Sequence, residues 1–242
     1  MKRLHTHAQH FLSGPQLVAE LIGHSNIHKN DLVYDLGAGS GVITSVLARR
    51  CRKVVAVEIE PRALVALRKN MADYDNVTIV AKDILTVTPP TKPYKIFANI
   101  PFHLSAQIVR KYTEGDRPPQ AMYLIVQKQF AQKLVPSPHH FTAQLGAQLG
   151  ARFTAQVRRP LKRTDFTPPP AVDTVLLELK LRDTPLISPP QLAAYRDFVA
   201  RCFAEQKFFA KTPRAKAGIS SELRPSQLSL EQWQALFLTY QK

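Results

Sequence analysis

Long apolar runs are missing from this 242-residue sequence. The longest, such as 122–126 and 175–177, suit a β-strand and fall far short of the ~20 residues with which a helix crosses a bilayer. Lys2 and Arg3 resemble the start of a signal peptide, but polar residues and histidines follow where its apolar segment would stand. We therefore expect a cytoplasmic protein that does not associate with membranes.

Cysteine is almost absent as well. Two residues, Cys51 and Cys202, are too few for a disulfide framework, and no Cys/His spacing suggests a zinc site. Five histidines lie among residues 5–28 without an accompanying set of acidic or cysteine ligands. We expect reduced, partly buried thiols, no bound metal, and an amino-terminal arm that faces RNA.

Acidic residues are scarce relative to basic ones: 18 Asp and Glu stand against 33 Lys and Arg, giving a net charge of +15 and a pI near 10.0. Such an excess predicts a polyanionic partner. Nucleic acid is favoured over an anionic membrane because no basic amphipathic helix is obvious; a solvated basic surface is the alternative. Two clusters are the candidate RNA-binding residues: Arg158, Arg159, Lys162 and Arg163, and then Lys207, Lys211, Arg214 and Lys216.

Strand and helix patterns alternate over residues 31–128, which predicts an α/β fold with a mainly parallel sheet. Residues 152–157 and 172–181 follow as two strands without a helix between them, which indicates an antiparallel hairpin at the sheet edge. After Ser188-Pro189-Pro190 the apolar residues recur at helical spacing. We predict a catalytic domain over residues 1–182 and a small, all-helical domain over residues 183–242.

A glycine-rich loop, Asp35–Gly41, follows the first predicted strand and opens a helix. Gly37 and Gly39 allow the backbone to pass close to a ligand, where a Cβ would clash. The spacing differs from the G-x-G-x-x-G fingerprint of dinucleotide-binding proteins. A carboxylate at Asp35 is a poor neighbour for a pyrophosphate and a good partner for an ammonium group.

Two more acidic residues end the following strands. Glu58 can accept the hydroxyls of a ribose, as in other doubly wound folds. Asp83 can accept a hydrogen bond from an adenine amine, and Ile84 would cover the ring. A ligand with an amino-acid end, a ribose and an adenine but no phosphate satisfies this set, which predicts S-adenosylmethionine as the cofactor.

Asn99-Ile100-Pro101-Phe102 follows the fourth strand and is the candidate catalytic motif. The lone pair of adenine N6 is delocalised into the ring. The Asn99 side-chain oxygen and the Ile100 carbonyl can accept both N6 hydrogens and so release that lone pair. Phe102 can stack on an extruded base and stabilise the transient positive charge. An ordinary turn would be the simpler interpretation, but its place after a strand of a cofactor-binding sheet favours the catalytic one.

These motifs resemble those of the rRNA adenine-N6 methyltransferases of the Erm type, which confer macrolide resistance, and of their relatives in ribosome biogenesis. The match covers almost the whole chain. It includes Gln9-His10-Phe11-Leu12, Asp35–Gly41, Glu58, Asp83-Ile84, Asn99-Ile100-Pro101-Phe102 and residues 166–172.

The resemblance implies a Rossmann-like class I methyltransferase fold: a seven-stranded, mainly parallel sheet with an antiparallel edge hairpin, plus a small helical carboxyl-terminal domain. It also implies that His10 and Leu12 touch the cofactor, with Asn99 contributing to that site. Phe166 would stack on the target adenine opposite Phe102; packing of Phe166 into the core is the alternative.

Ile100 and Phe102 favour the resistance branch, because the biogenesis relatives carry Asn-Leu-Pro-Tyr at this motif. The expected substrate is therefore an adenine of 23S rRNA, methylated by a monomeric enzyme with macrolide–lincosamide–streptogramin B resistance as the result. His10 departs from the family's usual Asn. The alternatives are a small-subunit rRNA adenine dimethyltransferase and a non-catalytic nucleic-acid-binding protein; DNA adenine methyltransferases more often carry Asp/Asn-Pro-Pro-Tyr/Phe.

Overall fold

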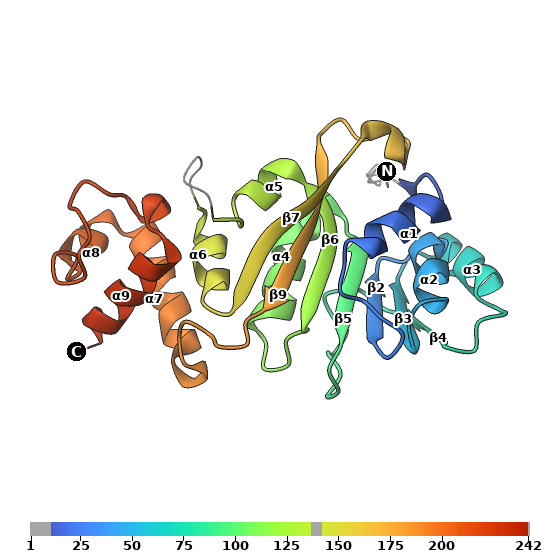
Figure 1. Cartoon of the computed structure of the whole chain (residues 1–242), viewed down its shortest axis with the longest axis horizontal. Coiled ribbons are helices and arrows are strands. Elements are labelled where there is room, and N and C mark those ends of the chain that lie inside the picture. Colours follow the sequence, from blue (N-terminus) through green and yellow to red (C-terminus); the bar gives the residue numbers. More distant parts are fainter. Residues whose placement is uncertain (1–10, 137–141, 242) are drawn as a thin grey trace, which may run out of the picture.

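A seven-stranded sheet forms the centre of the computed structural model, which describes residues 11–136 and 142–241. Its strand order is β4-β3-β2-β5-β6-β9-β7 (Figure 1). The first five of these strands are parallel, whereas β9 runs antiparallel to both β6 and β7. The strands are β2 (Leu32–Leu36), β3 (Lys53–Glu58), β4 (Val77–Ala81), β5 (Lys95–Asn99), β6 (Ala121–Gln127), β7 (Phe153–Leu161) and β9 (Thr174–Leu181).

Helices cover both faces of this sheet, so the strands carry continuous apolar runs. One face packs against α1 (Pro15–Gly23), α2 (Val42–Ala48) and α3 (Pro61–Asn70). The other packs against α4 (Ser105–Glu114), α5 (Lys128–Gln132) and α6 (Gln144–Gly150). The start of α3 is fixed locally: Pro61 occupies its first turn, and the Glu60 carboxylate accepts the Ala63 N–H at 2.6 Å. The predicted α/β fold with an antiparallel edge pair is confirmed.

A short two-stranded ribbon was not predicted. β1 (Phe11–Leu12) pairs antiparallel with β8 (Phe166–Thr167), which lies in the connection between β7 and β9. The ribbon joins two segments that are about 150 residues apart in the sequence. It therefore brings Phe11 and Leu12 to the edge hairpin, beside α1.

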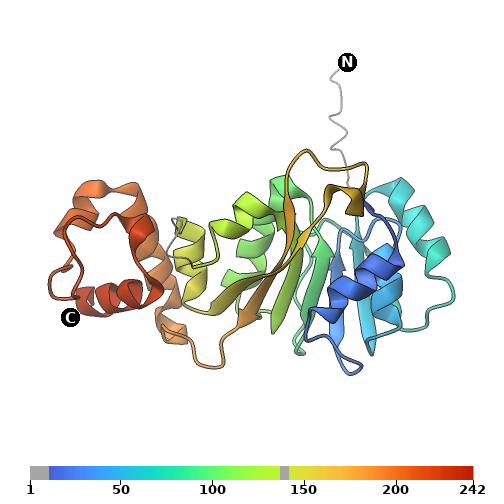
Figure 2. The same cartoon turned by 45° about the horizontal axis from the view of Figure 1, so that its top comes forward.

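The carboxyl-terminal region is helical, with α7 (Leu192–Ala204), α8 (Gln206–Lys211), α9 (Leu230–Tyr240) and the short 3₁₀ helices η3 (Pro189–Gln191) and η4 (Pro225–Gln227). These helices gather at the end of the molecule that is far from α2 and α3 (Figure 2). Trp233 is fully buried at their centre, and Ala147 and Ala151, from α6 and its end, join the same core. The predicted helical region is confirmed; the domain boundary at residue 182 stays a prediction, since α6 contributes to both cores.

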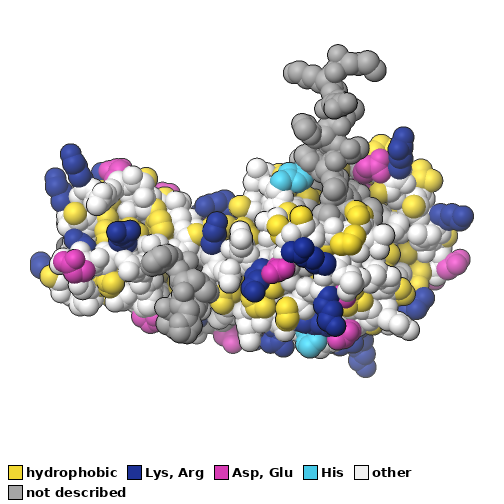
Figure 3. Space-filling view, turned by 90° about the horizontal axis from the view of Figure 1, so that it is seen from above, with side chains coloured by type: hydrophobic (Ala, Val, Ile, Leu, Met, Phe, Trp, Pro, Cys, Tyr) yellow, Lys and Arg dark blue, Asp and Glu magenta, His cyan; other side chains and the backbone are white. Residues whose placement is uncertain are grey.

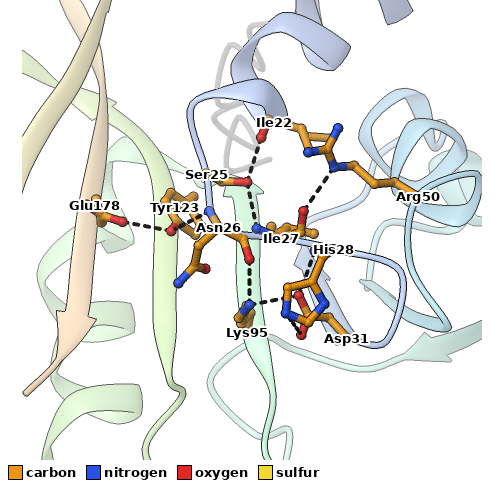
Figure 4. Close-up of polar contacts among 10 residues, drawn as sticks. All are labelled: Ile22, Ser25, Asn26, Ile27, His28, Asp31, Arg50, Lys95, Tyr123 and Glu178. Carbon is orange, nitrogen blue, oxygen red and sulfur yellow. Dashed lines mark hydrogen bonds and ion pairs between the residues drawn. The ribbon is translucent and has the colours of Figure 1, made fainter. Parts of the chain in front are cut away.

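A polar network fixes the amino ends of the strands. The Lys95 ammonium group, at the start of β5, contacts Asp31 Oδ2 at 2.8 Å and the Asn26 carbonyl at 2.7 Å (Figure 4). The Tyr123 hydroxyl accepts the Asn26 N–H and donates to Glu178. Pairing and hydrogen bonding offset the cost of burying the Lys95 charge. At this end of the sheet the polar groups of the network bind one another. Side chains that could bind a ligand are therefore sought at the opposite end.

Candidate active site

A cavity of about 600 Å³ opens at the carboxyl ends of the parallel strands. This is where ligands bind in open α/β sheets. Its lining comes from the segments after four neighbouring strands: residues 37–40 after β2, 58–60 at the end of β3, 83–84 after β4 and 99–104 after β5. Three carboxylates but no Lys or Arg belong to the lining among the described residues. The cavity therefore suits a cationic ligand better than one that carries phosphates.

The glycine-rich loop has the backbone that its sequence predicts. Gly37, Gly39 and Gly41 all have positive φ angles, of 76°, 56° and 95°. At Gly41 the requirement is also steric, because an added Cβ would lie 2.8 Å from Leu67 Cδ1 of α3. The N–H groups of Gly37 and Ala38 donate to the Val57 carbonyl, which ties the loop to β3.

Glu58 is the best-fixed polar group of the cavity. Its side chain is held at 2.8 Å by three backbone N–H groups, with Gly39 donating to Oε2 and both Ile59 and Glu60 donating to Oε1. A carboxylate has about four acceptor positions, so capacity remains for a hydroxyl of a bound ribose. The same carboxylate also determines where the loop at Gly39 lies.

Asp83 and Ile84 follow β4 and line the cavity. Asp83 Oδ1 accepts the Leu85 N–H at 2.8 Å, which fixes the side chain in a local turn. Ile84 is buried, and its Cδ1 atom lies 3.5 Å from where a Cβ of Gly37 would be. The pair thus offers an acceptor and an apolar wall beside the loop, which fits an adenine.

Asp35 lies elsewhere than its predicted role requires. Its side chain is fully buried beneath the loop and does not line the cavity. Thr44 donates to Asp35 Oδ2 at 2.6 Å, while Oδ1 has no hydrogen-bond partner in the described part of the chain. Burial raises the pKa of Asp35 to about 7, although the Thr44 hydrogen bond opposes the rise. The expected direct contact with an ammonium group is corrected: Asp35 supports the loop from below.

The candidate catalytic motif turns sharply into the cavity. Asn99 is the last residue of β5, and the 3₁₀ helix η1 (Phe102–Leu104) begins three residues later. The Leu104 N–H donates to the Pro101 carbonyl at 3.0 Å and closes the turn. Asn99 and Phe102 are half-buried and line the cavity. The structure therefore unites Asn99, Ile100 and Phe102 with the predicted cofactor residues in one space.

The amino-terminal and proline-rich motifs give a mixed result. Leu12 is buried in β1 and lines the cavity, whereas His10 lies outside the described residues. Phe166 is only 2% exposed, packs in the core against α1 and α2, and does not line the cavity. Stacking of Phe166 on a target base is therefore wrong for this structure. Its pairing with Leu12 turns it inward, which was the alternative interpretation.

The two basic clusters are separated and partly neutralised. In the first, Arg158 pairs with Glu178 at 3.7 Å, Arg159 pairs with Glu20, and Arg163 pairs with Asp173 at 3.7 Å; Lys162 is exposed. In the second, Arg214 packs over the Phe209 ring and donates to the Ser221 carbonyl, while Lys207, Lys211 and Lys216 are exposed. Seen from above, basic groups are spread along the molecule among acidic ones rather than gathered in one field (Figure 3).

Several lining residues were missed by the sequence analysis, among them Ile59, His103 and Gln127. Gln127 is the last residue of β6, so it occupies the same kind of strand-end position as Glu58 and Asn99. That position was a usable signal. The uncharged Gln127 amide is less conspicuous in the sequence than the carboxylate of Glu58.

Together, the sheet, the glycine-rich loop and the strand-end carboxylates define a class I methyltransferase that uses S-adenosylmethionine. Comparison with known families is more specific. The family "Ribosomal RNA adenine dimethylase" matches residues 2–212, so the chain belongs to that family. The prediction of an rRNA adenine methyltransferase is confirmed at this level.

The individual relatives include small-subunit rRNA methyltransferases as well as enzymes with other rRNA names. The chain is 28% identical to a ribosomal RNA small subunit methyltransferase A from Levilactobacillus brevis, over 92% of this chain and 84% of the relative. It is 29% identical to an rRNA adenine N-6-methyltransferase from Limosilactobacillus reuteri, over 96% and 95%. The crystal structure of the 23S rRNA methyltransferase ErmE superposes with a TM-score of 0.83 at 26% identity, covering 96% of this chain and all of that one. None of the described helices is long and apolar enough to span a membrane.

Proposed function

We propose that this chain methylates N6 of adenine in small-subunit ribosomal RNA. The support is the naming of its sequence relatives: small subunit methyltransferases A from Levilactobacillus brevis and Lactiplantibacillus plantarum match it at 28% and 30% identity. These relatives favour the biogenesis alternative over the large-subunit target that Ile100 and Phe102 predicted. The shared chemistry rests on the cavity that joins Asn99 to Glu58.

A large-subunit target is the second candidate, and two observations favour it. The chain spans 95% of the adenine N-6-methyltransferase from Limosilactobacillus reuteri and all of ErmE, but 84% of the small-subunit relative from Levilactobacillus brevis. The Asn99–Phe102 motif also has the form that the resistance enzymes share. In this case an adenine of 23S rRNA is the substrate, and macrolide–lincosamide–streptogramin B resistance follows.

Each cavity residue has a defined part in either case. S-adenosylmethionine supplies an activated methyl group on a sulfonium. Asn99 Oδ1 and the Ile100 carbonyl accept the N6 hydrogens, and Phe102 stacks on the extruded base, so that the amine is held for in-line attack. No protein base is needed, because attack by N6 leaves a neutral thioether and an N-methylated ammonium, which is acidic and releases its proton to water.

Cofactor contacts come from Leu12, Gly37, Gly39, Glu58, Asp83, Ile84 and Asn99, with His10 as a further contact expected from the resemblance. Glu58 orients the ribose and Asp83 with Ile84 receives the adenine. Asp35 takes part from below, through the Thr44 hydrogen bond that supports the glycine-rich loop.

RNA contacts outside the cavity are proposed for the exposed members of both basic clusters, above all Lys162, Lys207, Lys211 and Lys216. Binding through phosphates would weaken steeply with added salt; affinity that does not change with salt would exclude this part of the proposal. We further propose a catalytic domain over residues 1–182, a helical domain over 183–242, and action as a cytoplasmic monomer.

The deciding experiment is methylation of unmodified bacterial ribosomal RNA with methyl-labelled S-adenosylmethionine, followed by mapping of the labelled nucleotide. Label on small-subunit adenine N6 is expected. Label on one large-subunit adenine would replace the first candidate by the second, and the ratio of mono- to dimethyladenine would define the product. RNA binding without label would overturn both.

A further inference from the structure

Gln127 stands beside the catalytic motif on the neighbouring strand. Asn99 of β5 is paired in register with Ile125 of β6, and Gln127 follows two residues later at the strand end. Side chains alternate along a strand. Phe97 of β5 and both Tyr123 and Ile125 of β6 pack in the same core cluster, so Asn99 and Gln127 also share that face of the sheet.

The distance between these positions matches a nucleobase. A strand rises about 3.3 Å per residue and neighbouring strands lie about 4.8 Å apart. Two residues along β6 and one strand across therefore place the Cα atom of Gln127 roughly 8 Å from that of Asn99. Both side chains line the cavity together with Phe102. The three residues thus border one side of the cavity, away from Glu58 and Asp83.

The backbone at Gln127 is fixed by hydrogen bonds, whereas its side chain makes none to the described residues. Gln127 is paired with Thr174 of β9, and the next N–H, that of Lys128, donates to the Asp173 carbonyl at 2.8 Å. Gln127 is half-buried, and its side-chain amide has no hydrogen-bond partner within residues 11–136 and 142–241. Gln127 lines the cavity, so this amide is available to a ligand that enters there.

We propose that the Gln127 amide donates a hydrogen bond to N1 of the target adenine and so positions the base. The inference rests on the proposed base site at Asn99. With both N6 hydrogens accepted by Asn99 and Ile100, the adjacent N1 is an acceptor that needs a donor, and a Gln amide has two. Guanine carries a carbonyl oxygen where adenine has its amine, so two acceptors would oppose each other at the Ile100 carbonyl, whereas the Gln127 amide can turn over to accept the guanine N1–H.

Gln127 is a positioning residue and does not activate the amine. A hydrogen bond to N1 draws electron density from the ring and cannot increase the nucleophilicity of N6. Its contribution must therefore appear in the binding and orientation of the base. Losing one such hydrogen bond changes affinity by about tenfold.

The test replaces Gln127 by Met, which keeps the length of the side chain and removes the donor. RNA is the hairpin that carries the adenine mapped with the wild-type enzyme. Gln127→Met should raise KM for RNA about tenfold, leave kcat within about threefold, and leave the Kd of S-adenosylmethionine unchanged. Gln129→Ala, on an exposed residue of α5, is the matched control and should change none of these.

A modified base isolates the contact itself. Replacing the target by 1-deazaadenosine, which lacks the N1 acceptor, should cost the wild type about tenfold in kcat/KM and cost Gln127→Met nothing further. A full additional loss in the variant, or an unchanged KM for unmodified RNA, would overturn the proposal. Cofactor binding verifies that the variant is folded; should Gln127→Met fail to bind it, Gln127→Ala is measured in its place.

The proposed function and this inference fail differently. No methyl transfer by the wild type to any ribosomal RNA would refute the function, and with it the adenine that Gln127 is proposed to hold. Wild-type transfer with an unaffected Gln127→Met enzyme would refute the inference alone.

Discussion

The two halves of the cavity are built differently. On the cofactor half, Glu58 is held by three backbone N–H groups and the loop is tied to β3 through the Val57 carbonyl. On the target half, Asn99, Phe102 and Gln127 reach the cavity as side chains from strand ends and a short 3₁₀ helix. A cofactor is bound in one fixed shape, whereas a base must enter and leave at each turnover. The comparison predicts that substitutions in one half change cofactor affinity and those in the other change the binding or the turnover of RNA.

The largest effect is expected at Asn99. Asn99→Ala removes an acceptor of the N6 hydrogens, and removal of one such preorganised group typically lowers kcat by about 10²–10³. Single-turnover methyl transfer to ribosomal RNA measures it, with calorimetry of S-adenosylmethionine binding alongside. Asn99→Asp keeps an acceptor oxygen and should recover part of the rate. If the cofactor Kd rises as much as kcat falls in Asn99→Ala, the two halves are not separate.

Glu58→Gln should show the converse. The amide replaces one acceptor by a donor that opposes the backbone N–H groups, and hydrogen bonds to charged groups contribute about 1.5–3 kcal/mol. The Kd of S-adenosylmethionine should rise about 10–100-fold, with kcat at saturating cofactor nearly unchanged. Asp73→Asn makes a similar charge change at an exposed position and should leave the Kd as it is.

Substitution of Phe166 tests whether this residue belongs to the target half of the cavity. Phe166→Leu keeps an apolar side chain in the core and should lower the free energy of unfolding by about 1–1.5 kcal/mol, while kcat/KM changes less than about threefold. Urea unfolding and methyl-transfer kinetics measure the two quantities. A large kinetic loss without a loss of stability would restore Phe166 as a base-stacking residue.

Asp35→Asn is expected to alter mainly the pH dependence of stability. The folded-state pKa of Asp35, about 7, lies above the ~3.9 of an unfolded Asp. The stability that Asp35 contributes is therefore complete below about pH 4 and is lost as the pH rises through 7. The Asn variant stays neutral. As the pH rises from 5 to 8, the unfolding free energy of the variant minus that of the wild type should therefore increase in urea titrations. Parallel pH curves for the two proteins would contradict the buried, proton-binding state of Asp35.

Much of this site was predictable because it depends on local patterns. The alternation of strand and helix predicted a parallel sheet, and the carboxyl ends of parallel strands meet at one edge. Residues such as Glu58, Asp83 and Asn99 could therefore be assigned to one cavity from their places after successive strands. The positive φ angles of the glycines follow from the same local reasoning, since glycine alone adopts them without strain.

Burial and pairing were not predictable in this way. Asp35 is an acidic residue near the end of β2, as Glu58 is at the end of β3, yet Asp35 lies under the loop with Thr44, whereas Glu58 faces the cavity. Arg159 seemed free for RNA until Glu20, which is 139 positions earlier in the chain, proved to be its partner. These differences arise from contacts between elements that are remote in sequence.

By itself, the sequence determined the α/β fold, the glycine-rich cofactor loop and the Asn99–Phe102 motif, because each is encoded in a few neighbouring residues. Only the tertiary structure decided which side chains of these motifs are accessible. It turned Phe166 inward by pairing β8 with β1, and it placed Gln127 on the same face as Asn99. The physical reason is that periodicity sets how a side chain leaves its own element, whereas packing with distant elements decides what that side chain meets.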